Sequence, residues 1–287
     1  MSAESSNERK RLPEWFKIKL PSDKRFAGTG ARLRKNNLRT ICEEARCPNR
    51  AECWSCGTAT FLLMGPACTR ACRYCNVGTD APSALDDKEP GSVALAARDM
   101  GLKYVVITSV TRDDLPDGGA AHFSKTIKAV REMIDGSRIE VLVPDFMGIR
   151  DSVMKVVDEK PYVFGHNVET VEALFPELRP QGDFNRTLKV LELVKNEEPS
   201  MITKSGIMLG LGETDEQVLE TLKALYEAGV DRVTMGQYLQ PASFLAPVDR
   251  FVTPEEFRQW ENEAYSIGFK WVKAAPNVRS SYHAEQE

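Results

Sequence analysis

Six of the seven cysteines in this 287-residue chain form two groups of three between residues 42 and 75. The groups are Cys42, Cys47 and Cys53, followed by Cys68, Cys72 and Cys75. Closely spaced thiolates bind metal ions or iron–sulfur clusters, and closed sites of either kind use four ligands. Each group therefore predicts a metal centre in which one position is open or is filled by another kind of residue.

The second group has the spacing C-x3-C-x2-C, with Tyr74 directly before its last cysteine. In this respect the loop resembles the cluster-binding motif of the radical S-adenosylmethionine (SAM) superfamily. The resemblance implies a 4Fe-4S cluster whose open iron binds the amino and carboxylate groups of SAM. Reductive cleavage of SAM then yields a 5′-deoxyadenosyl radical. We expect the ring of Tyr74 to stack beside the adenine.

Two other interpretations of the cysteines are a zinc-binding loop and a disulfide framework. Zinc ribbons usually show paired C-x2-C knuckles, which these groups lack. Disulfides belong to oxidising compartments, and the sequence has neither a secretory signal pattern nor an apolar run long enough to cross a membrane. We therefore expect a soluble cytoplasmic protein with no membrane partner.

The composition is that of an enzyme with one large core. With 42% hydrophobic residues, 287 residues suffice for a single barrel-sized domain. The net charge of −4 argues against nucleic acid as the main partner, because phosphate binding requires a concentrated basic surface.

Short apolar runs alternate with helical periodicity along the chain. The predicted strands are Thr60–Met64, Tyr104–Ser109, Ile139–Val143, Tyr162–His166, Ser205–Leu209 and Arg232–Met235. The predicted helices are Val93–Met100, Ala120–Ile134, Asp151–Asp158, Phe184–Val194, Glu216–Ala228 and Glu255–Ile267. This alternation predicts an α/β fold with a parallel sheet.

In parallel sheets the ligands bind at loops that follow the strands, whether the sheet is open or closed. The second cysteine group follows the first predicted strand, which supports the radical SAM interpretation independently of the spacing. The superfamily resemblance implies a partial (β/α)6 TIM-type barrel. Its open side would suit a large substrate.

Two further loops resemble superfamily SAM contacts. The polar run Thr108–Asp114 could bind the methionyl amino group or close the site. Residues Gly206–Glu213 resemble the pattern G-x-I-x-G-x-x-E, in which Met208 and Gly210 lie near the adenine. The same run could equally be a strand that ends in an ordinary turn. Asn167 is a candidate ribose contact.

Four other residues have open interpretations. Arg112, Arg179 and Lys204 either meet a carboxylate of SAM or the carrier backbone, or form surface salt bridges. Cys56 belongs to neither cysteine group, and we interpret it as a bystander thiol.

The first cysteine group indicates one particular family within the superfamily. Four segments together resemble the lipoyl synthase family. They are C-E-E-A-R-C-P-N-R-A-E-C-W, G-T-A-T-F, V-T-R-D-D-L-P-D-G-G-A and the terminal R-S-S-Y-H-A. In that family the first group and a serine of the R-S-S motif hold an auxiliary 4Fe-4S cluster. We assign this ligand to Ser281, with Ser280 as the second choice. In the alternative, both serines form only local hydrogen bonds.

The resemblance implies radical insertion of two sulfur atoms at C6 and C8 of a protein-bound octanoyl-lysine, with the auxiliary cluster as sulfur donor. The expected partners are octanoylated carriers, namely the glycine cleavage H protein and E2 subunits of 2-oxoacid dehydrogenases, with ferredoxin or flavodoxin as electron donor. We expect residues 1–58 to form an extension, 59–275 the barrel and 276–287 a C-terminal segment folding back over the barrel mouth. Another two-cluster radical enzyme and an iron–sulfur electron carrier are the competing functions.

Overall fold

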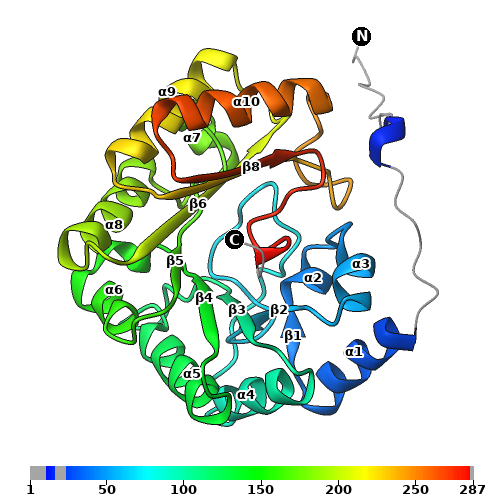
Figure 1. The fold of residues 1–287 in the computed structure, drawn as a ribbon, viewed down its shortest axis with the longest axis vertical. Coiled ribbons are helices and arrows are strands. Elements are labelled where there is room, and N and C mark those ends of the chain that lie inside the picture. The colour runs from blue at the N-terminus through cyan, green and yellow to red at the C-terminus, as the bar shows by residue number, and fades with distance from the viewer. Residues whose placement is uncertain (1–10, 17–23, 285–287) are drawn as a thin grey trace.

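A curved sheet of eight strands ringed by helices forms the centre of the molecule (Figure 1). The computed structural model describes residues 11–16 and 24–284. The strands lie in the sheet in chain order, and only the first pair, β1 (Arg39–Thr40) with β2, is antiparallel. The parallel strands are β2 (Thr60–Leu63), β3 (Tyr104–Ser109), β4 (Arg138–Leu142), β5 (Val163–Gly165), β6 (Ile202–Leu209), β7 (Arg232–Gln237) and β8 (Trp271–Ala275).

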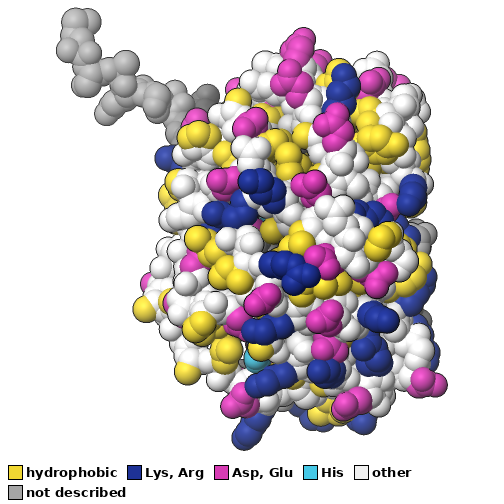
Figure 2. Space-filling view, turned by 90° about the vertical axis from the view of Figure 1, so that its left-hand side faces the viewer, with side chains coloured by type: hydrophobic (Ala, Val, Ile, Leu, Met, Phe, Trp, Pro, Cys, Tyr) yellow, Lys and Arg dark blue, Asp and Glu magenta, His cyan; other side chains and the backbone are white. Residues whose placement is uncertain are grey.

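Helices connect the parallel strands and cover the outside of the sheet (Figure 1). They are α4 (Glu89–Asp99), α5 (Ala120–Met133), α6 (Arg150–Val157), α7 (Phe175–Leu178), α8 (Phe184–Glu197), α9 (Asp215–Glu227) and α10 (Pro254–Ile267). Before β2 lie η1 (Glu14–Phe16), α1 (Lys24–Lys35), α2 (Ile41–Glu44) and α3 (Arg50–Ser55), and the short turns η2 (Phe146–Gly148) and η3 (Glu172–Leu174) occur later. Acidic and basic side chains alternate over the helical face drawn in Figure 2.

Local sequence explains where these elements begin. Thr214 and Thr253 each form a capping box, with Gln217 and Glu256 respectively, which satisfies the first free backbone N–H groups of α9 and α10. All four residues of β2 are buried, as expected for a parallel strand covered on both faces. The main core lies between the inner strands and their helices.

The predicted partial barrel is confirmed, and the six predicted strands correspond to β2–β7. A seventh parallel strand, β8, was not predicted, because Trp271–Ala275 contains a lysine and two alanines, which are poor strand formers. Helix α4 begins at Glu89, before the predicted Val93, since Pro90 is tolerated in a first turn. Within the described residues β1 and β8 pair only with β2 and β7, which leaves the barrel open.

After β8 the chain turns back into the centre of the ring (Figure 1). Two inward-facing glycines make room for it. A Cβ atom on Gly236 would lie 2.1 Å from the carbonyl oxygen of Val278, and one on Gly206 would lie 2.7 Å from Ser280 Oγ. The described part of the segment ends with Ala284, which is fully buried in a small apolar cluster with Tyr104. The C-terminal residues therefore fold back onto the barrel as predicted.

The boundaries at residues 58 and 275 stay predictions, and residues 1–10, 17–23 and 285–287 lie outside the described part of the chain. Among the helices that the structure describes, none combines the length and the apolar character needed to cross a membrane.

Candidate active site

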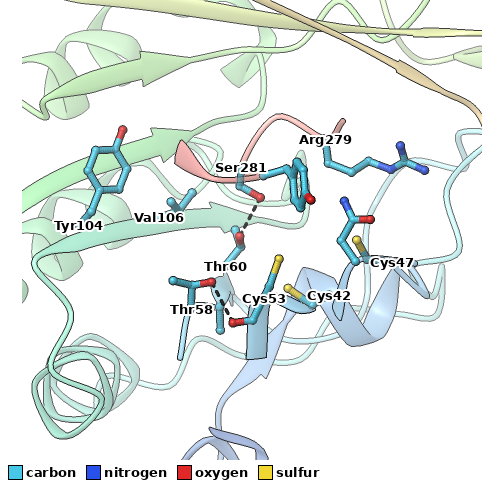
Figure 3. Close-up of a pocket in the computed structure, with 12 residues that line it drawn as sticks. Cys42, Cys47, Cys53, Thr58, Thr60, Tyr104, Val106, Arg279 and Ser281 are labelled. Atoms are coloured by element: carbon cyan, nitrogen blue, oxygen red, sulfur yellow. Dashed lines mark hydrogen bonds between the residues drawn. The ribbon is translucent and has the colours of Figure 1, made fainter. Parts of the chain in front are cut away.

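The first cysteine group lines a pocket between the N-terminal helices and the start of the sheet (Figure 3). Cys42 lies on α2 and Cys53 on α3, and Cys47 is in the loop that joins these helices. The pocket has about 500 Å³ of empty space, part of it open to solvent. Thr60, Tyr104, Arg279 and Ser281 complete its wall, together with Asn49, Thr58, Ala59, Val106 and Tyr282. Residues about 220 positions apart in the chain therefore meet at this pocket.

The two adjacent serines of the C-terminal segment have different surroundings. Ser281 lines the cysteine pocket, and its Oγ accepts a hydrogen bond from the Thr60 hydroxyl at 2.9 Å (Figure 3). Ser280 instead exchanges two hydrogen bonds with the side chain of Asn167, at 2.7 and 3.0 Å. Of the two serines, Ser281 is therefore the one placed beside the first cysteine group.

The donor set of this pocket, three sulfur atoms and one hydroxyl oxygen, fits a four-ligand iron–sulfur centre. Burial raises the pKa of Cys42 to about 11 and that of Cys53 to about 12, so in the apo chain these thiols are protonated at neutral pH. Metal binding would release those protons. All seven cysteines are free thiols in the structure.

Over the described ranges, no three histidine, cysteine or acidic side chains converge on a point where a single metal ion could sit. The ligands of an iron–sulfur cluster bind different irons and so lie farther apart than the ligands of one ion. Cysteines that line a pocket without meeting at one point are compatible with cluster binding.

The second cysteine group forms the loop after β2, at the carboxyl ends of the strands. Cys68 Sγ accepts hydrogen bonds from the backbone N–H groups of Arg70 (3.4 Å) and Thr111 (3.3 Å). Burial raises the pKa of Cys75 to about 12, and it raises the pKa of Cys72 against the opposing charge of Arg179. The two backbone donors fix the position of the Cys68 sulfur at the start of the loop.

Arg70, inside this loop, fixes it to the neighbouring strands. Its guanidinium donates to Asp113 and to Asp145, with shortest contacts of 2.7 Å to each. The side chains of Arg70 and Asp145 are 4% and 1% exposed, and Asp145 also accepts from Arg186 at 2.7 Å. This buried ion network positions the cysteine loop against the ends of β3 and β4. No feature of the local sequence marks this network.

A second pocket of about 350 Å³ lies inside the barrel, and Asn167, Met208 and Ser280 are among the residues that line it. Tyr74 and Met208 belong to one small apolar cluster. The structure therefore brings these three predicted SAM contacts, Asn167, Met208 and Tyr74, to the same side of the barrel. Arg279 lines this pocket as well as the first.

Gly210, the fourth predicted SAM contact, does not line this second pocket. Its φ is +94°, and a Cβ atom there would lie 2.1 Å from the Gln237 side chain. The carboxylate of Glu213 accepts hydrogen bonds from the backbone N–H groups of Gly210 (2.6 Å) and Leu211 (2.8 Å). Strand β6 therefore ends in a turn at Gly210, and the contact of this residue with SAM stays a prediction.

Lys204, Arg179 and Arg112, whose interpretations were left open, differ in their burial and in their partners. Lys204 is 1% exposed and pairs with buried Glu140 at 3.1 Å, so the surface interpretation is wrong for this lysine. Arg179 is 8% exposed and lies over the ring of Phe175, and its Nε has no hydrogen-bond partner among the described residues. Arg112 pairs with Asp114 at 2.7 Å.

Glu169 is a pocket residue that sequence analysis missed. It lines the second pocket, where it accepts a hydrogen bond from Asn167 at 3.1 Å, and burial raises its pKa. No motif marks this glutamate, but its position two residues after Asn167 at the end of a strand was a usable signal.

Two family models match parts of the chain. The model of the radical SAM superfamily matches residues 62–237, which run from within β2 to the end of β7. A second model, the N-terminal domain of lipoyl synthase of the radical SAM family, matches residues 2–47.

Curated relatives match nearly the whole chain. The lipoyl synthase of Caldanaerobacter subterraneus is 50% identical over 275 residues, covering 96% of this chain and 96% of the relative. The lipoyl synthase of Klebsiella pneumoniae is also 50% identical, covering 96% of this chain and 86% of the relative. That of Myxococcus xanthus is 48% identical, covering 97% and 94%.

Solved structures share the fold at low identity. The FeFe-hydrogenase maturase HydG from Carboxydothermus hydrogenoformans superposes with a TM-score of 0.57 at 15% identity, covering 88% of this chain and 72% of HydG. Coproporphyrinogen III oxidase from Escherichia coli, described as a radical SAM enzyme, gives 0.52 at 14% identity, covering 72% and 52%. These solved structures show the fold, whereas the curated relatives show the family. The chain belongs to the lipoyl synthases, enzymes of the radical SAM superfamily.

Proposed function

We propose that the protein inserts two sulfur atoms, at C6 and C8, into an octanoyl group attached to a lysine of a lipoyl-carrier protein. The observation that carries this proposal is the pocket that Cys42, Cys47, Cys53 and Ser281 share. A radical enzyme that only cleaved SAM would need the second cysteine group alone. The additional pocket offers a separate place for a sulfur-donating cluster.

In this proposal the two cysteine groups hold different 4Fe-4S clusters. Cys68, Cys72 and Cys75 hold the radical cluster, and the first group with Ser281 holds the auxiliary cluster. When bound, the radical cluster with SAM supplies the 5′-deoxyadenosyl radical, and the auxiliary cluster supplies sulfur. Serine oxygen is a harder and poorer ligand for iron than thiolate, which suits a ligand that must be given up.

The residues of the second pocket are proposed to bind SAM. Asn167 would contact the ribose, while Tyr74 and Met208 would contact the adenine. Their placement in one pocket and one apolar cluster supports this assignment. Gly210 has weaker support, because its backbone faces Gln237 and Arg250.

The proposed macromolecular partners are octanoylated H protein and E2 subunits, with ferredoxin or flavodoxin as reductant. Clusters held by thiolates call for a reducing compartment, and we therefore propose that the protein acts in the cytoplasm.

An anaerobic assay tests the proposed function. Reconstituted protein is mixed with dithionite, SAM and an octanoyl-lysyl peptide, and the peptide and nucleoside are analysed by mass spectrometry. The expected products are a peptide with two added sulfurs and 5′-deoxyadenosine. If 5′-deoxyadenosine forms while the peptide stays unchanged, the substrate assignment is wrong. If neither product forms in protein with full cluster content, the radical assignment is wrong too.

Two triple variants are the matched controls for this assay. Replacing Cys68, Cys72 and Cys75 with alanine should abolish both products. Replacing Cys42, Cys47 and Cys53 with alanine should abolish only the sulfur-containing peptide. An electron carrier would not form 5′-deoxyadenosine in any of these proteins.

A further inference from the structure

The C-terminal segment that carries Ser281 is anchored on both sides of this serine. Before it, Asn49 Nδ2 donates a hydrogen bond of 2.6 Å to the carbonyl oxygen of Asn277. After it, Ala284 is fully buried in the cluster with Tyr104 and Val106. Between these anchors Val278 is the one aliphatic residue, and the side chains from Ser280 to His283 all make polar contacts.

Three of these polar contacts converge on one carboxylate, that of Glu52. The Tyr282 hydroxyl donates to its two oxygens at 3.0 and 3.1 Å, and His283 Nε2 lies 3.2 Å from Oε1. The Tyr282 ring lies in addition beneath the ammonium group of Lys273, 5.4 Å from the ring centre. Glu52 thus contacts two consecutive residues of the segment.

The chain positions of these residues link the carboxylate to the pocket. Glu52 directly precedes Cys53 on α3, and Tyr282 directly follows Ser281. Adjacent Cα atoms are 3.80 Å apart. The contact between Glu52 and Tyr282 therefore joins the residue before Cys53 to the residue after Ser281.

We propose that Glu52 is a positioning residue, which keeps Ser281 in the auxiliary pocket by holding Tyr282 and His283. The inference rests on the proposed function, because it gives Ser281 the role of a cluster ligand. It adds that the contact that holds this ligand in place comes from α3, the helix that also carries Cys53. Loss of the Glu52 contact would free Ser281 while leaving all three thiols in place.

Limited proteolysis of the full chain tests the contact without any cluster. Trypsin can cleave after Arg279 only when the segment leaves the barrel, and the released peptide of residues 280–287 is measured by mass spectrometry. Tyr282→Phe should raise the initial release rate about ten-fold, the size expected for a lost hydrogen bond to a charged group. Glu52→Gln should have a smaller effect, because the amide oxygen still accepts one hydrogen bond.

Controls and a double variant make this test specific. Tyr226→Phe and Glu263→Gln change exposed residues of α9 and α10 and should leave the rate unchanged. The double variant of Glu52 and Tyr282 should exceed Tyr282→Phe by a smaller factor than Glu52→Gln exceeds wild type, since the Tyr282 interaction is shared by both changes and only the His283 contact is left for Glu52 to lose. Equal rates in wild type and both single variants would overturn the inference.

Iron retention tests the consequence for the cluster. In a Cys68→Ala, Cys72→Ala, Cys75→Ala background, reconstituted protein should lose iron to a ferrous chelator several-fold faster when Glu52→Gln is added. In the complementary Cys42→Ala, Cys47→Ala, Cys53→Ala background the same change should have no effect. The inference would be overturned if Glu52→Gln changed the rate of iron loss by a similar factor in both backgrounds.

The two proposals fail in different ways. If the first background binds no iron at all with Glu52 intact, the proposed function is wrong, and the role of Glu52 at a cluster is wrong with it. If iron binds normally but neither the trypsin rate nor the chelation rate responds to Glu52 or Tyr282, only the inference about Glu52 is wrong.

Discussion

Ser280 and Ser281 are consecutive residues whose hydroxyl groups face different pockets. Ser280 hydrogen-bonds Asn167 in the proposed SAM pocket, and Ser281 accepts a hydrogen bond from Thr60 beside the first cysteine group. Arg279 lines both pockets. One short segment therefore contributes to the proposed radical site and to the proposed sulfur-donating site.

Ser281→Ala should separate the two activities. The change removes the proposed fourth ligand of the auxiliary cluster and touches no residue of the second cysteine group. We expect sulfur insertion to fall by at least about ten-fold, the loss that follows removal of one interaction of about 1.4 kcal/mol, while 5′-deoxyadenosine still forms. Quantifying both products in one anaerobic reaction checks this.

Ser280→Ala is the matched control for that substitution. Its hydroxyl faces Asn167, and the iron content of the auxiliary centre should therefore match that of wild type. A Ser280→Ala protein that lost auxiliary iron, beside a Ser281→Ala protein that kept it, would reverse the assignment of the ligand.

Thr60→Val should weaken sulfur insertion through Ser281. Valine keeps the shape of threonine but removes the hydroxyl that donates to Ser281 Oγ at 2.9 Å. A lost neutral hydrogen bond costs about 1 kcal/mol, which corresponds to about five-fold in rate. Thr60→Ser restores the donor and should recover most of the activity. Failure of serine to rescue would point to packing rather than hydrogen bonding.

Arg70→Met should destabilise the whole protein. Its side chain is 4% exposed, and its loss leaves the 1% exposed Asp145 with Arg186 as its remaining strong partner. Breaking a buried ion pair costs about 3 kcal/mol or more, so we expect the melting temperature to fall by about 8 °C. Arg98→Met, which removes an exposed ion pair with Asp99, should change it little. Differential scanning calorimetry compares the two variants.

The same network predicts how stability depends on pH. Burial acts to raise the pKa of Asp145, but the hydrogen bonds and charges of Arg70 and Arg186 outweigh it and hold this pKa well below the usual range. Because the folded-state pKa is depressed, the stabilisation is fully present above the unfolded-state pKa of about 3.9 and is lost as the pH falls below it. Urea unfolding should show a large difference between wild type and Arg70→Met at pH 7 that shrinks below about pH 4.

Local patterns in the sequence predict much of the fold and the two cysteine groups. Strands β2 to β7 are runs of apolar and β-branched residues, and their type follows from composition alone. Strand β8 carries Lys273 and two alanines, and it is held by pairing with β7 along its whole length. The start of β6 was missed for a similar reason, because Lys204 resembles a loop residue until its partner Glu140 is known.

Contacts between distant residues could not be predicted from the sequence. Arg70 meets Asp145 across 75 positions, and Tyr282 meets Glu52 across 230. Nothing in the local sequence distinguishes these residues from exposed charged or aromatic ones. The C-terminal serines were predictable only through family resemblance, and the choice of Ser281 over Ser280 depends on which way each hydroxyl faces in the fold.

The passage of residues 278–284 through the centre of the ring has a consequence for biosynthesis. The ribosome makes this segment after every strand of the sheet, so strands β2 to β7 can begin to associate during synthesis before Ser281 or Ala284 is available. The second cysteine group is then complete while the first still lacks its C-terminal wall. Of the two cysteine groups, the first is therefore the one whose surroundings are completed last.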